Sequence, residues 1–370
     1  MQTSSLPAYT FGHFTVDFSC GLILYRMIEQ GYADGAFAVS LILVYNIIAF
    51  GAQFFLGIIG DFIKDNGRIP AVAGCILCVG GLLTGEEAPL LTACLMGAGN
   101  ALFHVGGGTD ALIRSSGMSR AGIFVSAGAL GVAAGCHYGT SGEMHIQIAA
   151  SLLLFAAACI WVFCPGKRVC VCDTPAPSSK KGILPAEPIT GNGIFSVFVI
   201  LIAVYIRSWA GFAATVPDID GKFARFIPAF AAFAGKFAGG ILADIFGSRR
   251  TGTAAVLISA PLFLLGAEKT LFFLAALFFF NMAMPVTLCE LAGRMRGHEG
   301  FAFGLTALAL LLGYLTYYLL PAAEESVNSS AAFGVPVACI AAAIAIFITA
   351  SDRGALISEW ITPSDGTDEK

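Results

Sequence analysis

Charged side chains are scarce in this 370-residue chain, at 12% of the residues, whereas 57% are hydrophobic. Soluble domains carry about 25% charged residues, so no water-soluble fold could bury this much apolar surface. The apolar residues also form runs long enough to cross a hydrocarbon core of roughly 30 Å, which takes about 20 helical residues. Because a helix satisfies its own backbone hydrogen bonds in lipid, the sequence predicts a helical integral membrane protein.

The sequence also lacks the signatures of several other protein classes. It has a net charge of −4 and no Lys/Arg-rich arm, which argues against nucleic-acid binding. It has no Walker-type glycine-rich loop, which disfavours direct coupling to ATP, and no H-E-x-x-H, G-x-S-x-G or paired metal-binding histidine element. We therefore expect neither an enzyme nor a bound cofactor or metal. An intramembrane enzyme that uses His104, His137 or His145 is the weaker alternative.

Cysteine is present eleven times, but its placement indicates little chemistry. Most of the cysteines lie in apolar segments, where a thiol behaves as a small hydrophobe. Cys164, Cys170 and Cys172 cluster just after one apolar run and could in principle bind a metal. No matched pair or histidine follows at finger-like spacing, so we do not assign a zinc site there.

The apolar runs number six before and six after one long polar connector. The first ten residues have no positive segment and no small-residue cleavage site, so we expect a retained first helix from Phe11 onward. The connector holds five prolines and a Lys-Lys pair, which predicts a linker. We expect an N-terminal six-helix bundle at 1–163, a cytoplasmic linker at 164–192, a C-terminal six-helix bundle at 193–352 and a cytoplasmic tail at 353–370. The predicted helices are 11–28, 36–60, 69–85, 88–109, 120–137, 144–163, 193–213, 223–244, 251–267, 269–289, 299–320 and 331–350.

The positive charges predict an orientation in the membrane. If the N-terminus is cytoplasmic, most Lys and Arg residues of the loops fall on the cytoplasmic side, and the opposite loops carry acids such as Glu86, Glu87 and Glu324. Such a bias favours both termini inside the cell, in a multi-pass cell-membrane protein.

The two halves repeat one short loop. Gly57, Gly60 and Asp61 follow the second predicted helix, and Gly240, Ala243 and Asp244 follow the eighth at the same spacing. Arginines come a few residues later in both loops, as Arg68 and Arg249. A parallel duplication places the two loops at equivalent positions on one membrane face.

This small-x-x-small-Asp loop resembles the signature loop of the major facilitator superfamily. The resemblance implies twelve transmembrane helices in two pseudo-symmetric six-helix bundles. Asp61 and Asp244 can each face the positive N-terminus of a neighbouring helix and pair with Arg68 or Arg249, in a gating contact that breaks as the halves rock. The alternative is that both aspartates only cap a solvated turn.

A finer resemblance lies in the polar residues within the predicted helices. The elements Gly12–Asp17, Gly99–His104 and Tyr205–Ser208, with Arg120 to Gly128, look like the fosmidomycin-resistance-type drug/proton antiporters. This chain departs from that pattern at Val105, where those proteins usually have proline, and at Cys136, where they have proline after a glycine.

Three polar residues of the N-terminal half are candidates for proton coupling. His13 and Asp17 are four residues apart, so they share one helix face, and an imidazole beside a carboxylate can hold or pass a proton near neutral pH. A carboxylate inside the bilayer is costly enough to suggest a function. His104 precedes a run of three glycines where a helix can admit water or substrate. Structural hydrogen bonding is the alternative for all three.

Arg207 is the candidate of the C-terminal half. It lies deep in the seventh predicted helix and cannot shed its proton, so it must pair with an acid, a carbonyl or an anionic ligand. We expect it to bind an anion or to pair with Asp17; snorkelling to the outer surface is the alternative. Lys236 is a weaker candidate, as a tether or an uncharged buried amine.

These features predict a secondary active transporter that works by alternating access. The leading hypothesis is proton-coupled export of a small organic solute or drug, which can be anionic, by a monomer in the lipid bilayer. The alternative is a proton-coupled importer of an organic anion, because Arg207 would serve either direction. A non-transporting receptor of the same fold is the third hypothesis, because fold does not dictate function.

Overall fold

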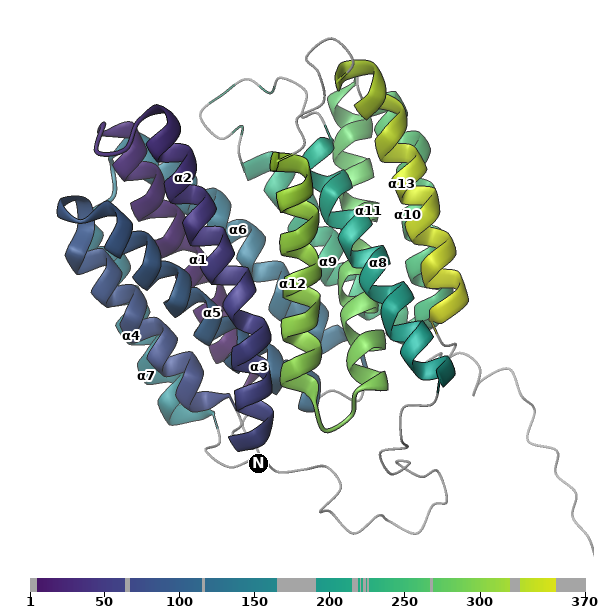
Figure 1. The fold of residues 1–370 in the computed structure, drawn as a ribbon, viewed down its shortest axis with the longest axis horizontal. Helices are drawn as coiled ribbons and strands as arrows, with labels where there is room; N and C mark the ends of the chain where they lie inside the picture. The colour runs from purple at the N-terminus through teal and green to yellow at the C-terminus, as the bar shows by residue number, and fades with distance from the viewer. Residues whose placement is uncertain are drawn as a thin grey trace, which may run out of the picture.

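The structure is a computed structural model, and it describes residues 5–63, 67–114, 117–164, 191–214, 219, 221, 224, 226–266, 269–319 and 327–350. Within these residues the regular structure is entirely helical and forms two bundles that stand side by side (Figure 1). The N-terminal bundle contains α1 (Leu6–Glu29), α2 (Gly35–Asn46), the π-helical turn η1 (Ile47–Gly51), α3 (Ala52–Ile63), α4 (Arg68–Thr84), the short 3₁₀ turn η2 (Gly85–Glu87), α5 (Pro89–Ile113), α6 (Ser119–Ser141) and α7 (Ile146–Phe163). The C-terminal bundle contains α8 (Gly191–Ala213), α9 (Phe226–Phe246), α10 (Ser248–Gly266), α11 (Thr270–Arg294), α12 (Glu299–Leu319) and α13 (Val327–Thr349).

The predicted twelve crossings are confirmed, because α2, η1 and α3 form one continuous helical rod. Among the described residues, eight helices are long and apolar enough to span a membrane on those criteria alone, and α4 and the described end of α13 are shorter apolar helices. The helix α1 is not among the eight. It packs against α4, α5, α6 and α7 with most of its side chains buried, so its polar residues face protein.

Several helices extend past their predicted ends, and α5 and α11 do so across a charged residue. The prediction ended them at 109 and 289, before the first charged residue, whereas α5 continues to Ile113 and α11 to Arg294. The charges are tolerated because they are paired: Arg114 Nε lies 2.7 Å from Asp110 Oδ1, and Arg294 Nη1 lies 2.7 Å from Glu290 Oε2.

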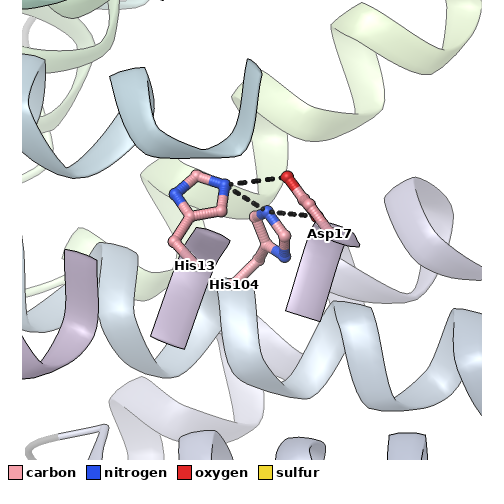
Figure 2. Close-up of side chains that lie close together, drawn as sticks. All are labelled: His13, Asp17 and His104. Carbon is pink, nitrogen blue, oxygen red and sulfur yellow. Dashed lines mark hydrogen bonds and ion pairs between the residues drawn. The ribbon is translucent and has the colours of Figure 1, made fainter. Parts of the chain in front are cut away.

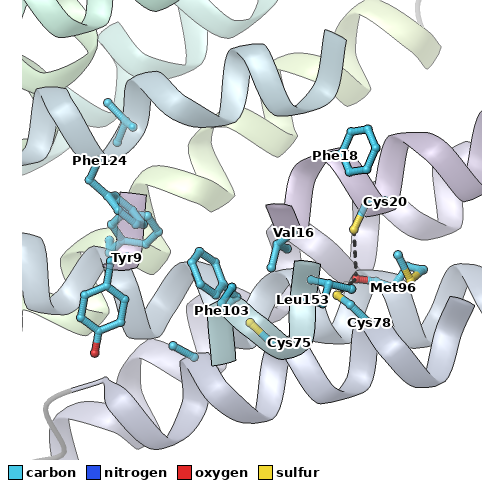
Figure 3. Packing of buried hydrophobic residues seen from close by; sticks show 14 of the residues in the cluster. Tyr9, Val16, Phe18, Cys20, Cys75, Cys78, Met96, Phe103, Phe124 and Leu153 are labelled. Atoms are coloured by element: carbon cyan, nitrogen blue, oxygen red, sulfur yellow. Dashed lines mark hydrogen bonds between the residues drawn. The ribbon is translucent and has the colours of Figure 1, made fainter. Parts of the chain in front are cut away.

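The core of the N-terminal bundle contains several of the cysteines, as Figure 3 shows. Cys20, Cys75 and Cys78 are buried among Val16, Phe103 and other apolar side chains. The thiols of Cys20 and Cys78 both lie near the carbonyl oxygen of Met96, at 3.8 and 4.0 Å. They pack as small hydrophobes, as expected. Cys164 is also buried, and Cys170 and Cys172 lie outside the described residues.

The closest packing between the bundles is along two helix pairs, α6 with α9 and α3 with α12, and α5 also contacts α12. Glycines make these approaches possible. A β-carbon on Gly57 of α3 would collide with the carbonyl of Gly300 in α12, and one on Gly122 of α6 would lie 2.8 Å from the carbonyl oxygen of Lys236 in α9. The glycine stripe of α6 also serves within its own bundle, where Gly131 and Gly135 contact the backbone of α1.

The domain boundaries stay a prediction, and most of the linker and the tail lie outside the described residues.

The orientation in the membrane also stays a prediction, and labelling can test it. A single cysteine placed at Glu86, in the η2 turn, should react with a membrane-impermeant maleimide in intact cells. The reason is that the Lys- and Arg-rich loops on the opposite face keep that face in the cytoplasm. Reaction only after permeabilisation would reverse the topology. Glu324, the other predicted outer-loop position, lies outside the described residues.

Candidate functional site

Three polar side chains converge where α1 and α5 meet. His13 and Asp17 lie one turn apart on α1, and His104 reaches them from α5 (Figure 2). His13 Nε2 is 3.2 Å from Asp17 Oδ2, His104 Nε2 is 3.7 Å from Asp17 Oδ1, and the two Nε2 atoms are 2.8 Å apart. We call these three residues the His–Asp cluster. The structure therefore brings together all three N-terminal residues expected to couple protons.

The outer nitrogens of both rings are held by backbone carbonyls. His13 Nδ1 is 2.7 Å from the carbonyl oxygen of Phe124, and His104 Nδ1 is 2.9 Å from that of Asn100. A carbonyl oxygen can only accept a hydrogen bond, so each Nδ1 must carry the proton. In a neutral imidazole with a protonated Nδ1, the Nε2 atom bears a lone pair.

This arrangement favours an additional proton in the cluster. Two neutral rings would place lone pairs against each other at 2.8 Å and against the Asp17 carboxylate. A proton on one Nε2 replaces a repulsion with a hydrogen bond, because that N–H can donate either to the other ring or to Asp17. The geometry thus fits an imidazole pair that shares one proton beside a carboxylate, and a proton so placed can enter or leave.

The surroundings hold the carboxylate in place. Asn100 Nδ2 donates a hydrogen bond of 2.9 Å to Asp17 Oδ1. Gly128 of α6 leaves the space for the cluster, since a β-carbon there would collide with both Asp17 and His13. His13 and Asp17 are only 5% and 8% exposed. Asn100 was not among the predicted site residues, although it lies one helical turn before His104 and thus on the same face.

The cluster also has a composition that suits metal ions. One ligand atom from each of His13, Asp17 and His104 lies within 4.8 Å of the others. Two nitrogens bound to one tetrahedral zinc are about 3.3 Å apart, given Zn–N bonds of about 2.0–2.1 Å. The observed Nε2 separation of 2.8 Å is shorter and matches a hydrogen bond. We therefore interpret the cluster as a proton site.

Arg207 is buried in the C-terminal bundle at 5% exposure, which does not fit snorkelling. Its guanidinium carbon lies 5.1 Å from the centre of the Phe280 ring, and its Nε has no hydrogen-bond partner among the described residues. Pairing with Asp17 is not observed in this state. The cation that interacts electrostatically with Asp17 is instead Lys236 of α9, which also interacts with Arg207 and His104.

The two repeated aspartates make crossed contacts between the bundles, which we call the latch. Asp61, near the end of α3, accepts hydrogen bonds from the backbone N–H groups of Gly300 and Phe301 at the start of α12, at 3.0 and 2.7 Å. Asp244, in α9, accepts them from Met118 and Ser119 at the start of α6, at 2.5 and 3.0 Å. Each carboxylate therefore caps a helix of the opposite bundle and meets the positive end of its dipole.

Comparison with solved structures identifies this architecture. The Escherichia coli fucose:proton symporter FucP matches with a TM-score of 0.67 and 13% identity, over 94% of this chain and 98% of that one. FucP in the outward conformation matches with a TM-score of 0.65, also at 13% identity, over 94% and 100% of the two chains. The human organic anion transporter MFSD10 (TETRAN) matches with a TM-score of 0.64 and 13% identity, over 93% and 97%.

The chain has the major facilitator superfamily fold. At this level of identity the likeness shows the fold alone. No family model matches the sequence, and no curated protein matches it. The finer resemblance to the fosmidomycin-resistance-type antiporters therefore remains a hypothesis carried by the residues.

The arginines of the two loops of this major facilitator fold bind within their own bundles. The guanidinium carbon of Arg68 lies 4.3 Å from the centre of the Trp161 ring in α7, and Arg249 Nε donates to the carbonyl of Ala350, just after α13, at 2.8 Å. The expected pairing of Arg68 with Asp61 is not what the structure shows. Backbone N–H groups of α12 occupy the Asp61 carboxylate, and Arg68 ties the start of α4 to the last helix of its half.

The latch makes the gating role of Asp61 and Asp244 testable. We expect Asp61→Asn and Asp244→Asn to slow transport while leaving the amount of folded protein unchanged. Each removes a negative charge from a helix N-terminus, a loss of about 1 kcal/mol, which is small for stability but enough to shift a near-balanced pair of states. Transport rate and expression should be measured together for both variants. Unchanged transport in both, at normal expression, would contradict the gating role.

Proposed function

We propose that the protein is a proton-coupled secondary transporter of a small organic solute, working by alternating access of its two bundles. The observation that supports the proposal is the His–Asp cluster, which is largely buried and whose geometry fits a shared proton. A protonation site that interacts with Lys236 of the opposite bundle can respond to the relative position of the bundles.

The latch supports the alternating-access part of the proposal. Both aspartate contacts lie on the face predicted to be cytoplasmic, and both join one bundle to the other. They must break if the bundles are to open toward that face. Because these contacts are hydrogen bonds to helix ends and not an extended apolar core, a modest change at the centre can tip the balance.

Two directions of coupling are compatible with this site. The resemblance to drug/proton antiporters favours export in exchange for protons, with the monomer in the cell membrane as the working unit. The buried Arg207 and the half-buried Lys236 favour the second candidate, in which an organic anion moves together with a proton.

The test is flux in proteoliposomes loaded with a pH-sensitive dye. Addition of a transported solute should move protons in a fixed ratio to solute, and an imposed pH gradient should drive solute against its own gradient. A protonophore serves as the control, since it should remove the concentrative phase. Solute flux that never moves protons, at any imposed gradient, would refute proton coupling.

A further inference from the structure

Two basic side chains of the C-terminal bundle lie close enough to influence each other. Arg207 of α8 and Lys236 of α9 interact electrostatically. Neither has a hydrogen bond or an ion pair to another described residue of its own bundle. Two like charges placed together in a membrane interior are costly unless something neutralises them.

The described acidic side chains of the C-terminal bundle have other hydrogen-bond or ion-pair partners. Among its described residues, Asp244 caps α6, Glu290 binds Arg294 and Ser248, and Glu299 accepts from the backbone of Gly297. All of these contacts lie at the latch end. The described carboxylate that does interact with the basic pair is Asp17 of the opposite bundle, through Lys236, and Asp17 is already bound by the cluster and Asn100.

The orientation of Arg207 suits an oxyanion. Its guanidinium carbon lies 5.1 Å from the Phe280 ring centre, and its buried Nε is without a hydrogen-bond partner among the described residues. A guanidinium offers a planar fork of N–H donors that matches the two oxygens of a carboxylate or phosphate group. Lys236, which interacts electrostatically with both Arg207 and Asp17, adds a compact second charge.

We propose that Arg207 and Lys236 bind the oxyanion group of an organic anion, a carboxylate or a phosphate ester, and that this anion binds together with the proton of the His–Asp cluster. The inference rests on the proposed function and names the substrate class and the sign of the coupling. It selects cotransport of anion and proton over exchange.

The sign of the coupling between proton binding and anion binding follows from charge. A proton added to the cluster makes the centre more positive and so strengthens binding of the anion. By reciprocity the bound anion strengthens binding of the proton by the same factor. The anion also attracts Lys236 away from Asp17, which leaves the carboxylate better able to hold the proton. A solute that must bind with a proton crosses with it, whereas an exchanger needs the two to compete.

The other titratable groups that face the cluster do not reverse the sign of the coupling between proton and anion. The helix α6 contributes the bare backbone of Gly128 at the contact. Tyr45 and Cys78 interact electrostatically with Asp17, but both are uncharged when protonated. Among the described residues, the titratable groups that form the cluster or interact with it and its neighbours are Tyr45 on α2, Cys78 on α4, His104 on α5, Lys236 on α9, and His13, Asp17 and Cys20 on α1.

The experiment measures binding to the purified full-length protein in nanodiscs at pH 5.5, 6.5, 7.5 and 8.5. The probes are succinate and lactate as carboxylates, glycerol 3-phosphate as a phosphate ester, and glycerol and choline as neutral and cationic controls. Thermal stabilisation reports binding, and proton uptake or release is read in weakly buffered solution. The variants are Arg207→Gln, Lys236→Gln and Lys236→Arg. Lys269→Gln removes an exposed lysine at the start of α11 as the matched control.

We expect at least one anionic probe to bind and glycerol and choline not to. Affinity should weaken at least about thirtyfold in Arg207→Gln and Lys236→Gln, as for a buried charged partner, and be restored in part by Lys236→Arg. Lys269→Gln should bind as the wild type does. Affinity should fall up to about tenfold per pH unit once the cluster loses its proton, and binding should take up protons.

Three outcomes would overturn the inference: no binding by any anionic probe, anion binding that both glutamine variants leave unchanged, or release of protons when an anion binds. Its failure is separable from failure of the proposed function. If glycerol or choline instead binds and is driven by a pH gradient in proteoliposomes, proton coupling stands and the anion site is wrong. If an anion binds as expected but its flux moves no protons, the anion site stands and the coupling is wrong.

Discussion

Replacing Asp17 by asparagine should abolish proton-driven accumulation of the solute while leaving solute-for-solute exchange measurable. The amide is close in shape to the carboxylate but cannot carry the negative charge that stabilises the shared proton of His13 and His104. For one proton per solute, a gradient of one pH unit supports about tenfold accumulation, and the ratio in the variant should fall to about one.

The control for this experiment lies on the same helix. Ser19 is buried two residues further along α1, and its hydroxyl donates within the helix to the carbonyl of Thr15. Ser19→Ala should therefore keep full coupling, which separates loss of the charge from general damage to α1. If Asp17→Asn retains concentrative transport across an imposed pH gradient, Asp17 is structural, and His104 becomes the residue to test.

Adding a single methyl group at Gly57 should open the latch. A β-carbon at this position would collide with the carbonyl of Gly300, so α3 and α12 could not keep their present separation. Overpacking of this kind costs about 1–3 kcal/mol, which changes a two-state equilibrium by roughly 5- to 150-fold. Gly57→Ala should therefore favour the state in which the bundles separate at this face.

Spin labels at Phe62 and His298 can measure the effect, since both side chains are exposed near the latch. In a cysteine-free background the distance between the labels should increase in Gly57→Ala. Gly60→Ala is the matched control, because a β-carbon there meets nothing within 4 Å. An unchanged distance distribution in Gly57→Ala would show that the α3–α12 contact adapts and does not set the balance between the states.

Much of the architecture could be predicted from local features. Helix number and the repeated aspartates follow from hydropathy and from a short repeated loop, which require no knowledge of neighbours. The predicted helix ends were wrong where contacts with other side chains determine the end of the helix. The helices α5 and α11 run past Asp110 and Glu290 because an arginine one turn later pairs with each acid, and hydropathy treats such a pair as a break.

The candidate site could likewise be predicted only in part from the sequence. His13 and Asp17 could be paired from sequence, since residues four apart share a helix face. The hydrogen bonds of the two rings could not be predicted, because they depend on which carbonyls meet the outer ring nitrogens, and those carbonyls belong to Asn100 and to Phe124 of another helix. The electrostatic interaction of Lys236 with Asp17 across the bundles could not be predicted either.

The sequence by itself determined that this is a helical membrane protein with two related halves, because hydropathy, charge bias and a repeated loop are properties of the chain alone. It also contains polar residues within its apolar segments, where their cost in lipid suggests a function. The tertiary structure alone decided which helix ends Asp61 and Asp244 cap, that Arg68 and Arg249 bind within their own bundles, and that Lys236 interacts electrostatically with both Asp17 and Arg207. The physical reason is that a charge or a hydrogen-bonding group acts on whatever lies within a few ångströms, and folding brings together residues that are more than a hundred positions apart.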